Sequence, residues 1–328
     1  MKKNHFITVA GFVISILLLY FSMKDIQFHE ILITLKKTDY RLVLISMLFI
    51  FVAATLSAYK WSKITGNNVR LRETFVALFI GLFINNVLPA RIGEIARGYV
   101  LSKKKGLSFT FAVSTVFVDR FFDLTGLLVI TFLFFPKHSL PPRVSQAIYI
   151  LIALLIVCII MMIIMSKKNI ANIIADKLTK IEKPLFIKFA KRIIEIQENL
   201  KRINSPLNLI FFVLISSIQW LAMSTALYFV ILTLGISIKP FYIPFVCALL
   251  NMGLTVPSSP GYVGVYQFLL VYLLAIFNVP KSEGFTVSIL YHATWYIPYN
   301  ILGFLFLLKE HLKIKEIRSL EETVGSKE

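Results

Sequence analysis

Long apolar runs separated by short polar segments dominate the pattern along this chain. About 20 consecutive apolar residues suffice for a helix to cross the hydrocarbon core of a bilayer. The runs that meet this length are 6–23, 42–59, 107–135, 147–165, 207–234 and 285–308. They predict an all-α, polytopic integral membrane helical bundle.

Two further apolar regions, 74–101 and 241–277, are broken near their middles by proline and glycine. Proline lacks a backbone donor and glycine loosens a helix, so a turn is expected at each break. Irregular backbone at membrane depth is tolerated only where protein buries it or where it lines a cavity. Each region is therefore predicted to form a re-entrant helical hairpin. The residues predicted to form the turns are Pro89, Gly93, Pro260, Gly261 and Gly264.

The two breaks resemble each other, since Pro89-x-x-Ile92-Gly93 matches Pro260-x-x-Val263-Gly264. With the amino terminus inside, the first hairpin enters from the cytoplasm and the second from outside. This is the inverted repeat from which many transporters build a central site. The predicted divisions are a first half over 1–165, a basic amphipathic cytoplasmic segment over 166–207, a second half over 208–308 and a basic cytoplasmic tail over 309–328.

Composition and charge agree with a membrane location. Only 16% of residues are charged, 57% are hydrophobic, and the mean hydropathy is +0.78. The net charge of +18 falls mainly on one side: 24 basic residues lie in predicted inside segments, 8 outside and 3 within the membrane. The positive-inside rule then places both termini in the cytoplasm of a multi-pass cell-membrane protein. The same rule explains the basic balance better than nucleic-acid binding does.

Charged residues at membrane depth are costly and are therefore functional candidates. Two readings are open for the charged set of the first half. One is a neutral salt-bridge network that ties the first hairpin to the span at 107–135. The other is a lipid headgroup site in which arginines hold a phosphate, for which the guanidinium fork is suited. The set comprises Arg91, Glu94, Arg97, Asp119, Arg120 and Asp123.

Uncharged polar residues are expected to line the same site. Asn85 and Asn86 precede the first break, and Tyr262, Gln267 and His292 belong to the second half. The alternative for His292 is an ordinary core histidine. No nucleotide-binding, hydrolase or zinc-protease motif is present, and the histidines lack metal-ligand spacing. We therefore predict no catalytic residue, no metal and no cofactor.

The motifs carry a family resemblance. Pro89-x-Arg91-x-Gly93-Glu94-x-x-Arg97, Asp119-Arg120-x-x-Asp123 and Pro260-Gly261-Tyr262-Val263-Gly264-Val265-Tyr266-Gln267 resemble the lysylphosphatidylglycerol synthase transmembrane family. The resemblance covers about 1–310. The chain departs from the family pattern at Asp119 and Gln267, where that pattern has glutamates.

The resemblance implies a flippase-like translocator of an aminoacylated phospholipid or of another lipid phosphate, such as a polyprenyl-phosphate lipid. It also implies a separate synthase or glycosyltransferase partner, because the soluble lysyl-transferring domain of the full-length synthases is not found in these residues. Two alternatives stay open: a secondary transporter of a small anion, and a membrane transferase acting on a lipid phosphate, as the family name phosphatidylglycerol lysyltransferase suggests.

Overall fold

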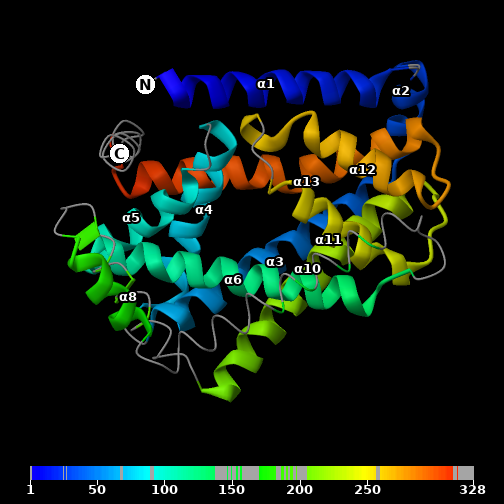
Figure 1. The fold of residues 1–328 in the computed structure, drawn as a ribbon. Coiled ribbons are helices and arrows are strands. Elements are labelled where there is room, and N and C mark those ends of the chain that lie inside the picture. Colours follow the sequence, from blue (N-terminus) through cyan, green and yellow to red (C-terminus); the bar gives the residue numbers. More distant parts are fainter. Residues whose placement is uncertain are drawn as a thin grey trace.

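The computed structural model describes 2–24, 26, 28–66, 69–88, 92–136, 170–181, 205–255 and 259–312, with isolated positions between 146 and 197 and at 316. Within these residues every regular element is a helix (Figure 1). The predicted all-α class is therefore confirmed. The predicted span at 147–165 lies outside the continuously described residues.

The long helices follow the predicted apolar runs, with shifted ends. The α-helices of the first half are α1 (Lys2–Met23), α2 (Phe28–Lys37), α3 (Tyr40–Thr65), α4 (Leu71–Val87), α5 (Gly93–Lys105) and α6 (Phe109–Leu133). The remaining elements are α8 (Ile170–Thr179), α10 (Pro206–Thr233), η2 (Pro240–Tyr242), α11 (Ile243–Gly253), η3 (Pro260–Tyr262), α12 (Val265–Ala275) and α13 (Lys281–Lys309).

Local capping explains where several helices begin and end. The Asp39 side chain accepts a hydrogen bond from the Arg41 amide at the start of α3, and Ser108 accepts one from the Phe111 amide at the start of α6. Both satisfy backbone donors that a helix leaves free in its first turn. Helix α5 ends at Gly106, whose left-handed φ of 64° suits a residue without a Cβ.

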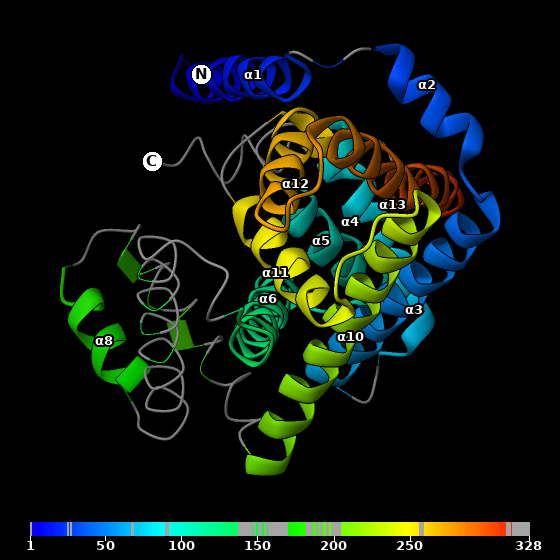
Figure 2. The same ribbon diagram turned by 90° about the vertical axis from the view of Figure 1, so that its right-hand side faces the viewer.

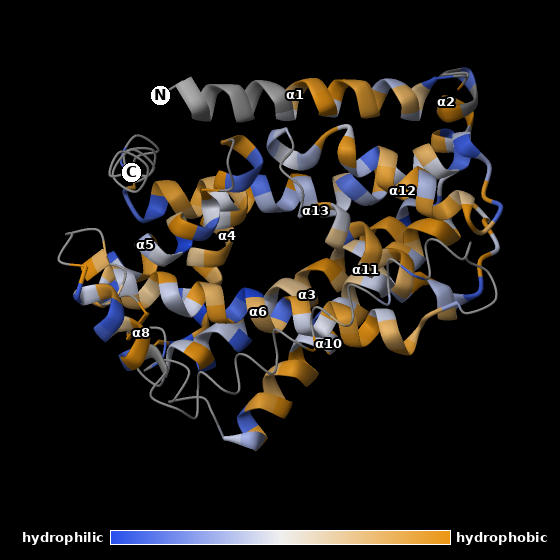
Figure 3. Cartoon of the chain, viewed as in Figure 1, coloured by the Kyte–Doolittle hydropathy of each residue, from blue (hydrophilic) through white to orange (hydrophobic). Residues whose placement is uncertain are grey.

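Helices α3 and α10 run antiparallel along each other. The rings of Phe49 and Phe229 stack with centroids 5.6 Å apart, and those of Tyr59 and Phe211 meet edge-on at 6.4 Å. Residue numbers therefore rise along α3 in the direction in which they fall along α10. Of the described helices, these two are long and apolar enough to cross a membrane. Figure 3 shows hydrophobic residues along much of the long helices.

Both predicted breaks interrupt the helices. In the first, α4 ends at Val87 and α5 begins at Gly93; in the second, η3 lies between α11 and α12. The turn residues at 89–91 and 256–258 lie outside the described residues. The breaks are confirmed, whereas re-entry into the membrane and the inverted relation of the halves stay predictions.

Glycine allows α4 and α5 to pack closely after the first break. A Cβ on Gly93 would lie 2.0 Å from the Gly81 carbonyl oxygen, so no other residue fits there without moving a helix. Asn85 completes the contact, since its Oδ1 accepts a hydrogen bond of 2.8 Å from the Gly93 amide. The resulting helix pair presents α5 to α6.

Helix α1 lies along α12, as both ribbon views show (Figures 1 and 2). Ser15 of α1 accepts a hydrogen bond of 2.9 Å from the Ser259 amide at the second break. A Cβ on Gly264 would lie 2.1 Å from the Ser15 carbonyl oxygen. Helix α1 therefore rests on the turn between α11 and α12.

Helix α8 falls within the segment predicted to be basic and amphipathic. Figure 2 shows it beside the main bundle rather than inside it. Ile173 and Ile174 are exposed, whereas Ala175 is buried. An exposed isoleucine pair beside Lys177 is consistent with an amphipathic helix.

Candidate functional site

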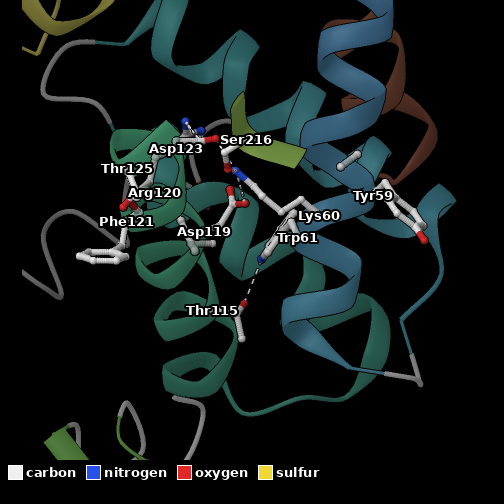
Figure 4. Close-up of polar contacts among 12 residues, drawn as sticks. Tyr59, Lys60, Trp61, Thr115, Asp119, Arg120, Phe121, Asp123, Thr125 and Ser216 are labelled. Carbon is white, nitrogen blue, oxygen red and sulfur yellow. Dashed lines mark hydrogen bonds and ion pairs between the residues drawn. The ribbon is translucent and has the colours of Figure 1, made fainter. Parts of the chain in front are cut away.

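Six charged side chains on three helices form a closed ring in which positive and negative charges alternate. Its buried half is centred on Lys60 of α3, which pairs with Asp119 at 3.2 Å and with Asp123, both of α6. Ser216 of α10 accepts a further hydrogen bond of 3.0 Å from the Lys60 ammonium. Figure 4 shows the Lys60 side chain pointing at all three. Lys60 and Asp119 are 0% exposed.

The other half of the ring is made by two arginines and Glu94. Arg97 binds Asp119 at 3.1 Å and Glu94 at 3.0 Å, both through its terminal nitrogens. Arg120 binds Glu94 at 2.9 Å and Asp123 at 3.0 Å, which closes the ring. Whereas the Arg97 side chain is 1% exposed, Glu94 is 28% and Arg120 35% exposed. The ring is therefore sealed at Lys60 and accessible at the edge between Glu94 and Arg120.

Lys60 is the ring member that the sequence did not indicate. The predicted span at 42–59 ends just before it, which counts Lys60 among the basic residues of the inside segments. In the structure α3 instead continues to Thr65, and Lys60, Trp61 and Ile64 in its last turns are buried. The continuing apolar periodicity through Trp61 and Ile64 was the available signal. The buried carboxylates of α6 explain why a lysine is stable there.

Aromatic and small residues hold the ring helices together. The Arg97 guanidinium lies over the Trp61 ring, 4.9 Å from its centroid, which is a cation–π contact. The Trp61 indole donates to Thr115 of α6 at 3.0 Å (Figure 4). On the opposite side, Trp220 of α10 donates to the Asp123 carbonyl oxygen at 2.9 Å. Contacts with side chains of α3, α6 and α10 therefore fix the position of the charged ring.

Hydrogen bonding within the ring is incomplete. Both carboxylate oxygens of Asp119 lie in ion pairs, yet neither is aligned for a hydrogen bond. Among the described residues, Nε and Nη1 of Arg97 also have no aligned hydrogen-bond partner, although Nη1 lies in the ion pair with Asp119. An unmet buried hydrogen-bonding group destabilises the folded state. At Asp119 the ion pairs with Lys60 and Arg97 compensate for the buried charge.

The second half contributes a separate polar group. The Gln267 side chain accepts a hydrogen bond of 2.7 Å from the Gly264 amide and lies 3.0 Å from Nδ1 of His292. The His292 ring stacks on Tyr266 with centroids 4.5 Å apart and lies 4.7 Å from Trp295. Gln267 and His292, which are far apart in sequence, are therefore brought together.

The remaining predicted residues take different positions. Asn85 stabilises the first break, because its side chain accepts a hydrogen bond from the Gly93 amide. Asn86 is buried, and its Nδ2 has no hydrogen-bond partner in the part of the chain that the structure describes. Tyr262 lies in η3, with a φ of 61° and its ring 6.4 Å from that of Trp295. Arg91 and Pro89 lie outside the described residues, so their predicted roles stay predictions.

No metal centre is apparent where the structure is described: no three His, Cys, Asp or Glu side chains there are placed to hold an ion. The ring carboxylates face ammonium and guanidinium groups instead. At its accessible edge the ring holds the Glu94 carboxylate between the guanidinium groups of Arg97 and Arg120.

Comparisons with known proteins identify relatives along nearly the whole chain. Residues 8–303 match the model of the lysylphosphatidylglycerol synthase TM region. A UPF0104 membrane protein of Methanocaldococcus jannaschii is 28% identical over 243 residues, which cover 72% of this chain and 97% of the relative. A UPF0104 membrane protein of Pyrococcus horikoshii is 24% identical over 330 residues, covering 94% of this chain and 97% of the relative.

The family match explains the apolar helices: the protein is a helical membrane protein of a group related to lipid modification or transport. The quoted motifs at 89–97, 119–123 and 260–267 all fall within the matched residues. This chain belongs to the lysylphosphatidylglycerol synthase transmembrane family.

Proposed function

We propose that this protein moves an anionic lipid, an aminoacylated phospholipid or another lipid phosphate, between the leaflets of the cell membrane. The observation that carries the proposal is the position of Glu94. Its carboxylate lies between Arg97 and Arg120, at 3.0 and 2.9 Å, on the accessible edge of an otherwise sealed ring. That is the position in which two guanidinium groups would hold a phosphate.

Glu94 thus acts as an internal substitute for the headgroup when the site is empty. A lipid phosphate that enters at the exposed edge displaces the carboxylate and pairs with Arg120 first, because Arg120 is 35% exposed and Arg97 only 1%. The buried half of the ring, Lys60 with its two aspartates, stays in place and holds α3 against α6.

Charge balance makes phosphate binding dependent on a proton. Lys60, Arg97 and Arg120 balance Glu94, Asp119 and Asp123, so the ring is neutral when every member is ionised. A bound phosphate adds at least one negative charge in a medium of low dielectric. Protonation of a displaced Glu94 is the least costly compensation, since both aspartates remain bound to Lys60.

Alternating access follows from the two interrupted helix pairs. We propose that α4 with α5 and α11 with α12 are re-entrant hairpins of opposite orientation, with both termini in the cytoplasm. The first hairpin carries Glu94 and Arg97, so movement of this pair against α6 changes which side reaches the ring. Alternating access by such movements is general for transporters built from inverted repeats. A membrane-bound synthase or glycosyltransferase would supply the lipid.

The experiment is translocation of a reporter-labelled phosphatidylglycerol in proteoliposomes. Arg120→Ala removes the exposed charge-assisted contact, worth about 1.5–3 kcal/mol, and translocation should slow about tenfold or more. Lys103→Ala, which removes an exposed lysine distant from the ring, is the matched control and should be neutral. Unchanged translocation in Arg120→Ala would show that the lipid phosphate does not use the ring.

A further inference from the structure

The polar group of the second half, Gln267 with His292, specifies which nitrogen of the imidazole carries the proton. The Gly264 amide is a donor, so the Gln267 atom 2.7 Å from it must be the carbonyl oxygen. The other end of the same amide is then the NH2 group, and it lies 3.0 Å from Nδ1 of His292. Because the NH2 group only donates, Nδ1 must accept.

A histidine that accepts at Nδ1 is neutral and carries its proton on Nε2. A charged imidazolium would place an N–H at Nδ1 against the NH2 group of Gln267. Turning the glutamine amide to avoid this would set its NH2 group against the Gly264 N–H. The hydrogen-bond chain from Gly264 therefore holds His292 as an uncharged donor.

The Nε2–H donor of His292 is buried and lacks a well-aligned acceptor. His292 is 6% exposed, and Nε2 meets the geometry of a hydrogen bond with no partner among the described residues. The Gly261 backbone lies close enough to interact with the imidazole but is poorly aligned with Nε2. A buried donor without a well-placed partner destabilises the folded protein by about 1–3 kcal/mol. A donor held so firmly and paired so poorly indicates that a better-placed acceptor is supplied from elsewhere.

Aromatic rings restrict what that acceptor is. The imidazole stacks on Tyr266 at an interplanar angle of 24°, lies 30° from the plane of Trp295 and meets Tyr296 edge-on at 5.2 Å. Trp295 in turn donates to the Tyr266 hydroxyl at 3.2 Å. No ion pair of a charged side chain is described at this group, in contrast to the ring. The environment suits an uncharged oxygen rather than a phosphate.

We propose that His292 is a second lipid contact, whose Nε2–H donates to an uncharged oxygen of the bound lipid while the arginines of the ring hold its phosphate. The inference rests on the proposed lipid transport. The oxygen is a carbonyl or hydroxyl acceptor, carried either by the acyl-ester linkage or by the headgroup.

Nitrogen-15 NMR of histidine-labelled protein in nanodiscs tests this directly. The His292 signal is assigned by its loss in His292→Phe, and it should report a neutral ring protonated at Nε2. Adding an ester-linked phosphatidylglycerol should shift the Nε2–H signal. An ether-linked analogue with the same headgroup separates the sources: no shift identifies the ester carbonyl, and the same shift identifies a headgroup oxygen.

Three substitutions complete the test. Gln267→Glu replaces the donating NH2 group by an acceptor and should move a proton to Nδ1. His292→Gln keeps a donor near the Nε2 position and should retain more translocation than His292→Asn, which is too short to do so. A wild-type ring protonated at Nδ1, or an Nε2–H signal that neither lipid shifts, would overturn the proposal. If Arg120→Ala still slows translocation in that case, the proposed phosphate site at the ring is supported and only the lipid contact at His292 is wrong.

Discussion

Lys60 holds together the least accessible part of the charged ring, and its removal leaves two aspartates buried without their shared cation. Breaking a buried ion pair by removing one partner typically costs about 3–5 kcal/mol. Lys60→Met, which keeps the length of the side chain, should therefore lower the unfolding free energy by about this amount. Adding Asp123→Asn should restore part of the loss, because one unpaired charge is removed.

Arg120→Ala should be less destabilising than Lys60→Met, because the Arg120 side chain is 35% exposed and Lys60 is 0% exposed. Thermal unfolding of the purified variants, in detergent and in nanodiscs, measures how much each substitution destabilises the protein. Equal destabilisation would mean that the ring is sealed at Arg120 as well, and the proposed entry edge would be wrong.

Five of the six residues of the ring could be recognised as functional candidates from their charge within apolar runs, and four of the ion pairs join just these five. Lys60 could not, since a lysine at the end of an apolar run resembles an interfacial residue. The pairing of Gln267 with His292 was equally hidden, because it depends on the turn geometry at Gly264.

The close pairing of α4 with α5 depends on Gly93. Gly93→Ala would place a Cβ 2.0 Å from the Gly81 carbonyl oxygen. The helices must separate, and overpacking of this kind costs about 1–3 kcal/mol. Gly284→Ala in α13 is the control: its new Cβ would lie 3.6 Å from the Cα of Val271 in α12, an ordinary contact.

Thermal unfolding should rank Gly93→Ala well below wild type and Gly284→Ala close to it or slightly above. Because α5 carries Glu94 and Arg97, the separation should also reduce lipid translocation. Wild-type stability in Gly93→Ala would contradict the close approach of α4 and α5.

Three consecutive lysines at the end of α5 bind glutamates of three different segments. Lys103 pairs with Glu316 at 3.3 Å, Lys104 with Glu310 at the end of α13, and Lys105 with Glu73 at 3.1 Å. Glu73, which precedes the predicted hairpin, also accepts from the Arg70 amide at 2.6 Å. Burial raises the pKa of the Glu73 carboxyl, but the Arg70 amide and the Lys105 ammonium outweigh it and hold that pKa below its usual value.

A carboxyl with a lowered pKa in the folded state stabilises the protein above its unfolded pKa of about 4.3, and this contribution is lost as the pH falls through the folded value. Glu73→Gln keeps an acceptor for the Arg70 amide but removes the charge. It should thus lower stability at neutral pH by less than the about 1 kcal/mol that a whole helix cap contributes. The difference from wild type should shrink under acid. Stability curves against pH check this, and a difference that does not change with pH would exclude ionisation of Glu73 as its cause.

The whole molecule combines an accessible charged ring on α3, α5 and α6 with the uncharged pair of Gln267 on α12 and His292 on α13. Apolar runs predicted the helices, because burial in lipid imposes length and composition on each span. The same pattern could not reveal how the two halves face each other, since that depends on contacts between distant residues such as Ser15 and Ser259. The inverted orientation of the hairpins accordingly stays a prediction.

The most direct test of the central claim is the pH dependence of anionic lipid binding in nanodiscs, for wild type, Glu94→Gln and Arg120→Ala. If phosphate displaces Glu94 and the carboxylate takes up a proton, wild-type binding strengthens as the pH falls. Glu94→Gln should then bind at least as well with less dependence on pH, and Arg120→Ala should bind weakly throughout. Wild-type-like binding and pH dependence in both variants would contradict a headgroup site at this ring.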